Sequence, residues 1–275
     1  MDYKNKYFIA DAHVHVFPHK IAAKAAKNIS GFYDLPMECN EGSIESLVKA
    51  NKEAGVNISL ICSPATTPSQ TVGINRFIAE TSRAEKSVFP FGSVHPLSDD
   101  VERDIKSAKE AGLKGLKLHP DFQNFEIDSA FAMDIYLAAQ KYDMPILMHM
   151  GDARYSGSSP KRLAHVLKYL PDLKVIAAHL GGFQRWDESF LYLRGHKNLK
   201  FDTSSTLRFL SPEKSREIIK AFGTENVMFG SDFPMSLPET EIKRFLSLGF
   251  DEADNARILG ENFLEFFGLD RKDLD

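Results

Sequence analysis

The sequence of 275 residues lacks the marks of a secreted or membrane-spanning protein. It has only two cysteines, Cys39 and Cys62, which are too few for a disulfide framework in a chain of this length. No apolar run approaches the ~18 residues needed to span a bilayer, and the charged N-terminus is unlike a secretory leader. We therefore expect a protein of the reducing cytoplasm.

An excess of positive charge is missing as well. The 34 basic and 38 acidic residues give a formal net charge of −4. Nucleic acids and anionic membrane surfaces attract basic faces, so we expect neither as a partner and expect a small-molecule substrate instead. The same balance argues against a barrel-type nuclease. A homo-oligomer is compatible with the sequence but is not indicated by it.

Runs dense in Val, Ile, Leu and Phe alternate along the chain with stretches of helical periodicity. The expected strands are Tyr7–His15, Asn57–Ser63, Val88–Val94, Gly115–His119, Pro145–Met150, Lys174–His179, Leu199–Thr203 and Asn226–Asp232. The expected helices are Ile44–Ala54, Gly73–Glu85, Asp100–Ala111, Ala130–Lys141, Lys161–Tyr169, Phe183–Arg194, Glu213–Phe222, Pro238–Leu248 and Ala253–Phe267. This alternation predicts an α/β fold, which we interpret as a (β/α)8 TIM barrel.

A doubly wound open sheet alternates in the same way, but no Gly-rich dinucleotide fingerprint follows the first expected strand. Nothing in the composition divides the chain, so we predict a single domain over residues 1–275. The last amphipathic stretch, Ala253–Phe267, would be its C-terminal helical extension. The longest expected loops, Val16–Gly42 and Pro64–Thr71, follow the first two strands, on the active-site face of a barrel.

The first expected strand carries a His-x-His pair, His13 and His15. Side chains two positions apart on a strand point the same way, roughly 6–7 Å apart. Two such imidazoles can bind one metal ion at ~2.0–2.1 Å per bond. The alternative is a solvent-facing strand, but the intervening residues are those of a buried one. Asp11 lies on the same side, where we expect it to orient a ligand imidazole.

Three further candidate ligands end later strands: His149, His179 and Asp232. Each histidine is followed within two residues by glycine. Asp232 precedes Phe-Pro, so the capping of a helix explains it less well than a site does. Because the strand ends of a barrel meet at one mouth, these groups and the His-x-His pair predict a catalytic zinc site that is open to water.

Candidate substrate contacts lie on the fourth strand and after the fifth. Lys117 and His119 share one side of the strand. If that side faces inward, the lysine must be neutral, ion-paired or modified, whereas an ordinary strand-end cation is the alternative. His119 would contact substrate or carry a proton. Arg154 can grip an anionic substrate through its guanidinium fork, although loop arginines are commonly only solvated.

Six short motifs, in this order and spacing, resemble the amidohydrolase superfamily. The likeness is to its amidohydrolase-related branch (amidohydrolase 2), which includes aminocarboxymuconate semialdehyde decarboxylase. The motifs are Asp11–His15, Gly115–Pro120, Ala178–Gly182, Phe201–Ser204, Gly230–Pro234 and Asn262–Phe263. They cover nearly the whole chain, so the resemblance implies the same barrel throughout.

The resemblance also implies one or two divalent metal ions, usually Zn²⁺, with Mn²⁺ as an alternative. Carried over by position, the metal ligands are His13, His15, His149 and Asp232. His179 matches a general acid/base of one-metal members, or a ligand of the second ion in two-metal members. Lys117 could be the carbamylated lysine of two-metal members. We predict one ion and keep two as the alternative.

The predicted activity is hydrolysis of a small amide, ester or lactone by zinc-activated water. Asp232 would accept the proton as water attacks the carbonyl-type carbon, and His179 would polarise the developing oxyanion. The alternative is non-oxidative decarboxylation of a small aromatic or unsaturated carboxylate, with Lys117 or Arg154 gripping a carboxylate. A non-catalytic barrel that binds a partner is the third reading, because fold alone does not imply activity.

Overall fold

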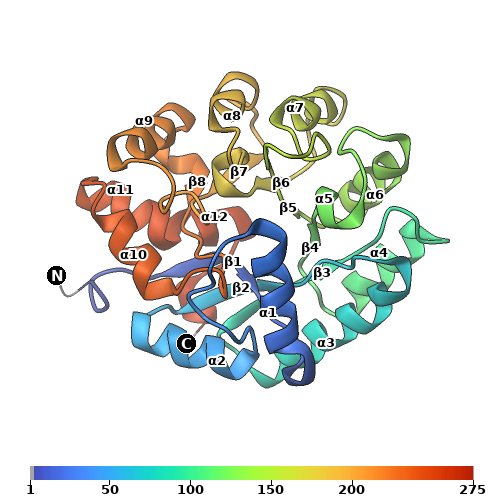
Figure 1. Ribbon diagram of the computed structural model, residues 1–275, viewed down its shortest axis with the longest axis horizontal. Coiled ribbons are helices and arrows are strands. Elements are labelled where there is room, and N and C mark those ends of the chain that lie inside the picture. Colours follow the sequence, from blue (N-terminus) through green and yellow to red (C-terminus); the bar gives the residue numbers. More distant parts are fainter. Residues whose placement is uncertain (1–2, 275) are drawn as a thin grey trace. The chain divides into compact units, whose positions relative to one another are not determined.

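The computed structural model describes residues 3–274, in which strands and helices alternate along the chain (Figure 1). Eight strands form one sheet in chain order. They are β1 (Ala10–His15), β2 (Ile58–Cys62), β3 (Val88–Ser93), β4 (Gly115–Leu118), β5 (Ile146–Met148), β6 (Val175–Ala177), β7 (Leu199–Asp202) and β8 (Val227–Met228). The predicted (β/α)8 barrel fold is confirmed.

The α-helices follow the strands in the expected alternation. They are α1 (His19–Tyr33), α2 (Ile44–Ala54), α3 (Thr71–Ala84), α4 (Val101–Glu110), α5 (Pro120–Gln123), α6 (Ala130–Lys141), α7 (Pro160–Tyr169), α8 (Trp186–Tyr192), α9 (Pro212–Phe222), α10 (Pro238–Leu246), α11 (Glu252–Ala256) and α12 (Asn262–Phe267). A π-helical turn, Arg257–Glu261, joins the last two into the predicted C-terminal extension. Within residues 3–274, no helix is both long and apolar enough to cross a membrane.

Every expected strand and helix is present, and α2 and α6 have the predicted bounds. The prediction that Val16–Gly42 forms a loop was wrong, because α1 occupies 15 of its residues. This helix buries only Ala22 and Ala26, so it adds little apolar surface to the core. Pro64–Thr71 is irregular apart from one 3-10 turn, Pro68–Gln70.

The contacts group the chain into two compact units. Unit 1 comprises the described residues up to Ile61, then Glu85–Phe89, and the described residues from Asp202 onward. Unit 2 comprises Cys62–Ala84 and Pro90–Phe201. The prediction of a single domain stays a prediction, and we describe each unit by itself.

In unit 1, backbone hydrogen bonds join β1 to the segment that follows β8. Ala12 N donates to Phe229 O at 2.8 Å, and Asp232 N donates to His13 O at 2.9 Å. The C-terminal extension supports β8 from its other end, since the Asn262 side-chain amide donates to the Val227 carbonyl at 2.7 Å. The segment that carries Asp232 is therefore held by hydrogen bonds to β1, which carries His13.

The segment after α1 is tied to the same part of unit 1. Glu38 N donates to Met235 O at 3.0 Å, and the Glu38 carboxylate accepts from Leu237 N at 2.9 Å. The Arg244 guanidinium on α10 lies 3.1 Å from Glu38 Oε1. Helix α10 also packs beside α2 (Figure 1). The residues just beyond Asp232 are thus held by bonds from Glu38, and Glu38 is in turn bonded to Arg244 of α10.

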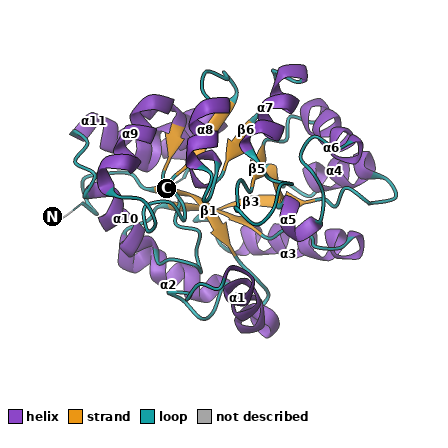
Figure 2. Ribbon diagram, turned by 45° about the horizontal axis from the view of Figure 1, so that its top comes forward, coloured by secondary structure: helices purple, strands orange, loops and turns teal. Residues whose placement is uncertain are grey.

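In unit 2, β3 to β7 pair as parallel neighbours. Strands β4, β5 and β6 are buried throughout, which agrees with the continuous apolar sequences of β5 and β6, while β4 buries Lys117 among apolar residues. Helix α4 packs against α6, and α7 against α8 (Figure 2). Gln123 binds the ends of two strand segments, because its amide donates to Ala65 O at 2.9 Å and to Val94 O at 2.8 Å. These bonds fix the loops at the carboxyl ends of the strands.

Gly151 is where the loop after β5 meets the loop after β6. Its φ is +97°, and an added Cβ would lie 2.2 Å from the Phe183 carbonyl oxygen. We expect Gly151→Ala to lower the free energy of unfolding by about 2–4 kcal/mol, because it adds backbone strain and a backbone clash. Urea unfolding measures this difference.

The matched control is Gly31→Ala in α1, where nothing lies within 4 Å of the added methyl group. There we expect a gain of ~0.5–1 kcal/mol, since alanine favours the helix. Equal stability of the two variants would contradict the close approach at Gly151.

Candidate active site

The predicted site residues fall into a cluster in each unit, and each cluster is described separately. The His13 cluster in unit 1 consists of His13, His15, Asp202, Ser204 and Asp232. The His149 cluster in unit 2 consists of His119, Asp121, His149, Ser158 and His179. Two of the remaining predicted residues, Lys117 and Arg154, lie in unit 2.

Three atoms of the His13 cluster have the spacing of ligands to one ion. The two Nε2 atoms of His13 and His15 are 3.2 Å apart. Asp232 Oδ1 lies 3.7 Å from the first of these atoms and 3.5 Å from the second. Ligand atoms at 2.0–2.1 Å from a tetrahedral ion are about 3.3–3.4 Å apart. The spacing of these side chains therefore fits a divalent metal ion, and their role as its ligands stays a prediction.

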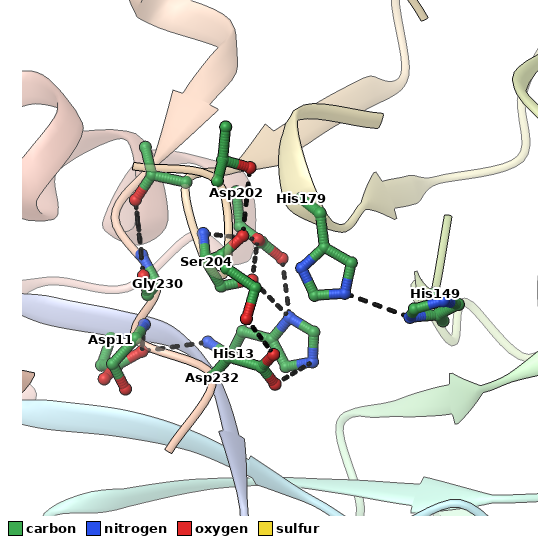
Figure 3. Close-up of polar contacts among 12 residues, drawn as sticks. Asp11, His13, His149, His179, Asp202, Ser204, Gly230 and Asp232 are labelled. Atoms are coloured by element: carbon green, nitrogen blue, oxygen red, sulfur yellow. Dashed lines mark hydrogen bonds and ion pairs between the residues drawn. The ribbon is translucent and has the colours of Figure 1, made fainter. Parts of the chain in front are cut away.

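The other ring nitrogen of His13 faces a carboxylate (Figure 3). His13 Nδ1 lies 3.0 Å from Asp202 Oδ2 and 3.0 Å from Ser204 Oγ. The side chains of His13 and Asp202 are fully buried. A ligand histidine that donates its second N–H to a carboxylate has a fixed ring orientation.

Asp11 does not have the role that its position suggested. We expected it to orient a ligand imidazole, but its Oδ1 accepts backbone N–H groups, from His13 at 3.2 Å and from Ser231 at 2.9 Å. The carboxylate beside the His13 ring belongs to Asp202. Burial raises the pKa of the Asp11 carboxyl to about 7, against the opposing effect of these hydrogen bonds. Asp11 thus connects the backbones of β1 and the β8 loop.

Asp232 stands on a loop and not at the end of a strand. The ladder of β8 ends at Met228, so the predicted strand Asn226–Asp232 was too long at its carboxyl end. Asp232 has a φ of +60°. Its second carboxylate oxygen, Oδ2, accepts a hydrogen bond from the Ser205 hydroxyl at 2.6 Å. Both oxygens of Asp232 therefore have polar neighbours in unit 1.

The His149 cluster is centred on two facing imidazoles. His149 Nδ1 lies 3.1 Å from His179 Nε2 (Figure 3), and His149 Nε2 lies 3.7 Å from Asp121 Oδ2. Both histidines are only 3% exposed, so a proton exchanged between them would be shielded from bulk water. His179 begins a short turn with a φ of +60°, so the predicted strand Lys174–His179 was too long by two residues at its carboxyl end.

His119 lies in a stack of rings beside this pair. Its imidazole is parallel to that of His149, with centroids 3.8 Å apart, and to the Phe122 ring on its other side. Ring nitrogens bind metals in the plane of their own ring, and two parallel stacked rings share no such plane. Ring nitrogens of His119 and His149 and a carboxylate oxygen of Asp121 lie within 4.8 Å of one another, so these side chains still form a candidate metal group, although the stacking is unfavourable for one shared ion. The role of His119 as a substrate contact stays a prediction.

Asp121 is a functional candidate that the sequence analysis missed. Burial raises the pKa of its carboxyl to about 6, although the hydrogen bond from the Ser158 hydroxyl at 2.6 Å opposes this rise. The charge of Asp152 raises the pKa further, while Arg185 and Arg154 lower it. A carboxyl of this kind can hold or release a proton near neutral pH.

The two basic side chains that we expected to bind substrate, Lys117 and Arg154, differ in their exposure to solvent. Lys117 is fully buried in β4. This is the inward-facing case, for which we expected a neutral, ion-paired or modified lysine. Arg154 is about half exposed, and its guanidinium lies against Asp152, with Nη2 2.7 Å from Oδ2. The charge of Arg154 is therefore already compensated within its own loop, and its substrate role stays a prediction.

The sequence analysis also gave no role to Asp202, Ser204 or Ser205. A signal was present, because these polar residues directly follow or end the apolar strand β7. The motif Phe201–Ser204 was recognised only as part of the family resemblance. Its function became visible when the structure placed Asp202 beside His13, 189 positions away in the sequence.

Comparison with solved structures shows the same fold across nearly the whole chain. An uncharacterized TIM-barrel protein from Bordetella bronchiseptica has a TM-score of 0.77 at 18% identity and covers 94% of this chain and 99% of its own. A 5-carboxyvanillate decarboxylase from Novosphingobium aromaticivorans, complexed with manganese and a nitrobenzoic acid, has a TM-score of 0.75 at 15% identity, with 98% of both chains covered. A probable 2-pyrone-4,6-dicarboxylic acid hydrolase from Acinetobacter baumannii has a TM-score of 0.68 at 17% identity, with 95% and 99% covered.

These low identities show the fold alone. The family follows from the sequence itself, since the amidohydrolase family model Amidohydro_2 matches residues 10–269. This range includes all six motifs that carried the resemblance. The solved structures that share the fold are described as a decarboxylase in one case and a probable hydrolase in another. The chain belongs to the amidohydrolase family, in the branch that its motifs indicated.

Proposed function

We propose that this protein is a metal-dependent, non-oxidative decarboxylase of a small aromatic carboxylate. The observation that supports metal dependence is the triangle of His13 Nε2, His15 Nε2 and Asp232 Oδ1, with sides of 3.2, 3.5 and 3.7 Å. Two imidazoles and a carboxylate are suitable ligands for Zn²⁺ or Mn²⁺. We propose one ion, and His149 as its fourth ligand stays a prediction.

When bound, the metal would act as a Lewis acid toward a substrate oxygen. In the reaction, the bond between a ring carbon and its carboxylate breaks and CO₂ leaves. The electron pair stays on the ring carbon, which then takes a proton. The chain must therefore hold the carboxylate, exclude water and deliver one proton.

His179 is the group that we propose to deliver this proton. Its Nε2 lies 3.1 Å from His149 Nδ1, so a proton has a path between the two rings. Asp121 Oδ2 lies 3.7 Å from the other nitrogen of His149, which is too far for a direct hydrogen bond, so its negative charge would stabilise a proton on the imidazole pair. We propose Lys117 and His119 as substrate contacts, since both are buried on or directly after β4.

Hydrolysis, which the sequence analysis placed first, is the second candidate. It requires Asp232 to accept a proton from water, but Oδ2 of Asp232 already accepts the Ser205 hydroxyl hydrogen. What favours decarboxylation is that the solved structures of the same fold include decarboxylases of 5-carboxyvanillate and of 2,6-dihydroxybenzoate. The observation that favours hydrolysis is the likeness to the probable 2-pyrone-4,6-dicarboxylic acid hydrolase.

A paired assay tests the two candidates. The purified chain is stripped with a chelator, reloaded with Mn²⁺ or Zn²⁺, and incubated with 5-carboxyvanillate, with 2,6-dihydroxybenzoate and, separately, with 2-pyrone-4,6-dicarboxylate. We expect CO₂ release from a hydroxybenzoate only after reloading. Opening of the lactone ring without CO₂ release would replace the proposal by hydrolysis, and undiminished turnover by the stripped chain would contradict metal dependence.

A further inference from the structure

The polar atoms behind His13 allow its ring proton to be placed. The Asp202 carboxylate presents Oδ2 to His13 Nδ1 at 3.0 Å. Its other oxygen, Oδ1, accepts two hydrogens from Ser204, one from the backbone N–H at 3.0 Å and one from the hydroxyl group. The two hydrogen bonds from Ser204 therefore fix the orientation of the Asp202 carboxylate relative to the His13 ring.

The hydroxyl hydrogen of Ser204 points to Asp202, so Ser204 Oγ offers a lone pair to His13 Nδ1 at 3.0 Å. His13 Nδ1 thus faces two acceptors, a carboxylate oxygen and a hydroxyl oxygen. A neutral imidazole carries one proton, and these neighbours hold it on Nδ1. The lone pair is then left on Nε2, the atom that faces His15 and Asp232.

Packing holds the three side chains in this arrangement. Gly230 passes so close that an added Cβ would lie 3.2 Å from the Cβ atoms of His13 and Ser204, and 3.3 Å from that of Asp202. His13, Asp202 and Ser204 are all fully buried. The Gly230 backbone therefore packs against the Cβ atoms of these three buried side chains.

We propose that Asp202, oriented by Ser204, is a positioning residue that sets the tautomer of His13 and so makes Nε2 a metal ligand. The inference rests on the proposed metal site at His13, His15 and Asp232. It assigns to Asp202 no contact with substrate and no proton transfer. Its effect is on metal affinity, because the wrong tautomer places a hydrogen where the metal–nitrogen bond must form.

The substitution Asp202→Asn separates this role from a purely structural one. The two hydrogens from Ser204 require the amide oxygen on their side, so the amide NH₂ group is presented to His13 Nδ1. The ring must then accept at Nδ1 and carry its proton on Nε2. Asp202→Ala removes the carboxylate without imposing either tautomer. A structural role predicts that asparagine is tolerated better than alanine, whereas tautomer control predicts the reverse.

The experiment uses the full chain, stripped of metal, with Mn²⁺ and Zn²⁺ affinities measured by chelator competition. We expect affinity to fall about 10–100-fold in Asp202→Ala and further in Asp202→Asn. Asp251→Asn, at the N-cap of α11, is the matched control and should bind as the unmodified chain does, since asparagine caps a helix as well as aspartate does.

The ring tautomer is read independently, in the metal-free chain, from ¹H–¹⁵N long-range NMR spectra assigned through His13→Gln. We expect the proton on Nδ1 in the unmodified chain and on Nε2 in Asp202→Asn. A proton on Nε2 of His13 in the unmodified chain, or an Asp202→Asn chain that binds metal more tightly than Asp202→Ala, would overturn the inference. The tautomer of the unmodified chain needs His13→Gln only to assign its signals and does not depend on the folding of either Asp202 variant.

The two proposals fail in distinguishable ways. If the unmodified chain binds neither metal, the proposed function fails, while the tautomer of His13 still tests the role of Asp202. The positioning role alone fails if the unmodified chain binds metal but carries its His13 proton on Nε2. It also fails alone if Asp202→Asn binds metal more tightly than Asp202→Ala.

Discussion

Replacing His13 by alanine is expected to abolish metal binding and turnover together. His13 supplies one of the three closely spaced ligand atoms and is fully buried, so no other side chain can readily take its place. Without the ion, the electrons released by C–C cleavage lose their stabilising charge, and we expect kcat/KM to fall by at least ~10³-fold. Metal content by elemental analysis and turnover of the same sample measure both effects.

The control for this prediction is His19→Ala. His19 begins α1, its side chain is 78% exposed, and its partner is Glu41. This variant should keep full metal content and activity. An His13→Ala chain that still held one ion per chain would show that the ion lies elsewhere.

Replacing His179 by asparagine is expected to lower kcat by about 10²–10⁴-fold while leaving the metal content unchanged. Asparagine is chosen because residue 179 has a φ of +60°, a conformation that asparagine adopts more readily than most residues do. The side chain then loses the ring that faces His149 at 3.1 Å, and with it the proton path between the two imidazoles. Steady-state kinetics and elemental analysis test the two halves of this prediction.

Loss of the metal from His179→Asn would assign His179 to a ligand role, as in two-metal members of the family. Unchanged kcat would assign the proton to another group, of which Asp121 is the first candidate because of its raised pKa. An Asp121→Asn chain, measured across pH 5–8, would then distinguish these alternatives. Its control is Asp172→Asn, an exposed position in unit 2.

The order of strands and helices could be predicted well from the sequence, because buried elements are rich in apolar residues. Strands buried on both faces read as runs of Val, Ile and Leu, as in β5 and β6. The apolar composition predicted the carboxyl ends of strands less well, as for β6 and β8. Phe229 is fully buried yet lies beyond the last residue of β8, because an apolar side chain reports burial and not membership of a hydrogen-bonded ladder.

The candidate site was predictable where the signal is local. His13 and His15 are two positions apart on one strand, and strand geometry alone turns them to the same side. Asp202 carries no such signal, because its partner is 189 positions away and becomes adjacent only through folding. Asp11 was assigned its role for the opposite reason, since nearness in sequence suggested a contact with the ring that the structure gives to Asp202.

The tie between Glu38 and the residues after Asp232 has a practical consequence for anyone who exchanges segments with a relative. Glu38 bonds to the backbone of Met235 and Leu237, and its carboxylate meets Arg244. Grafting a foreign loop after α1 without its matching β8 loop would break these bonds and displace the carboxylate of Asp232. The two segments are therefore best transplanted as one cassette, with Arg244 retained as its anchor.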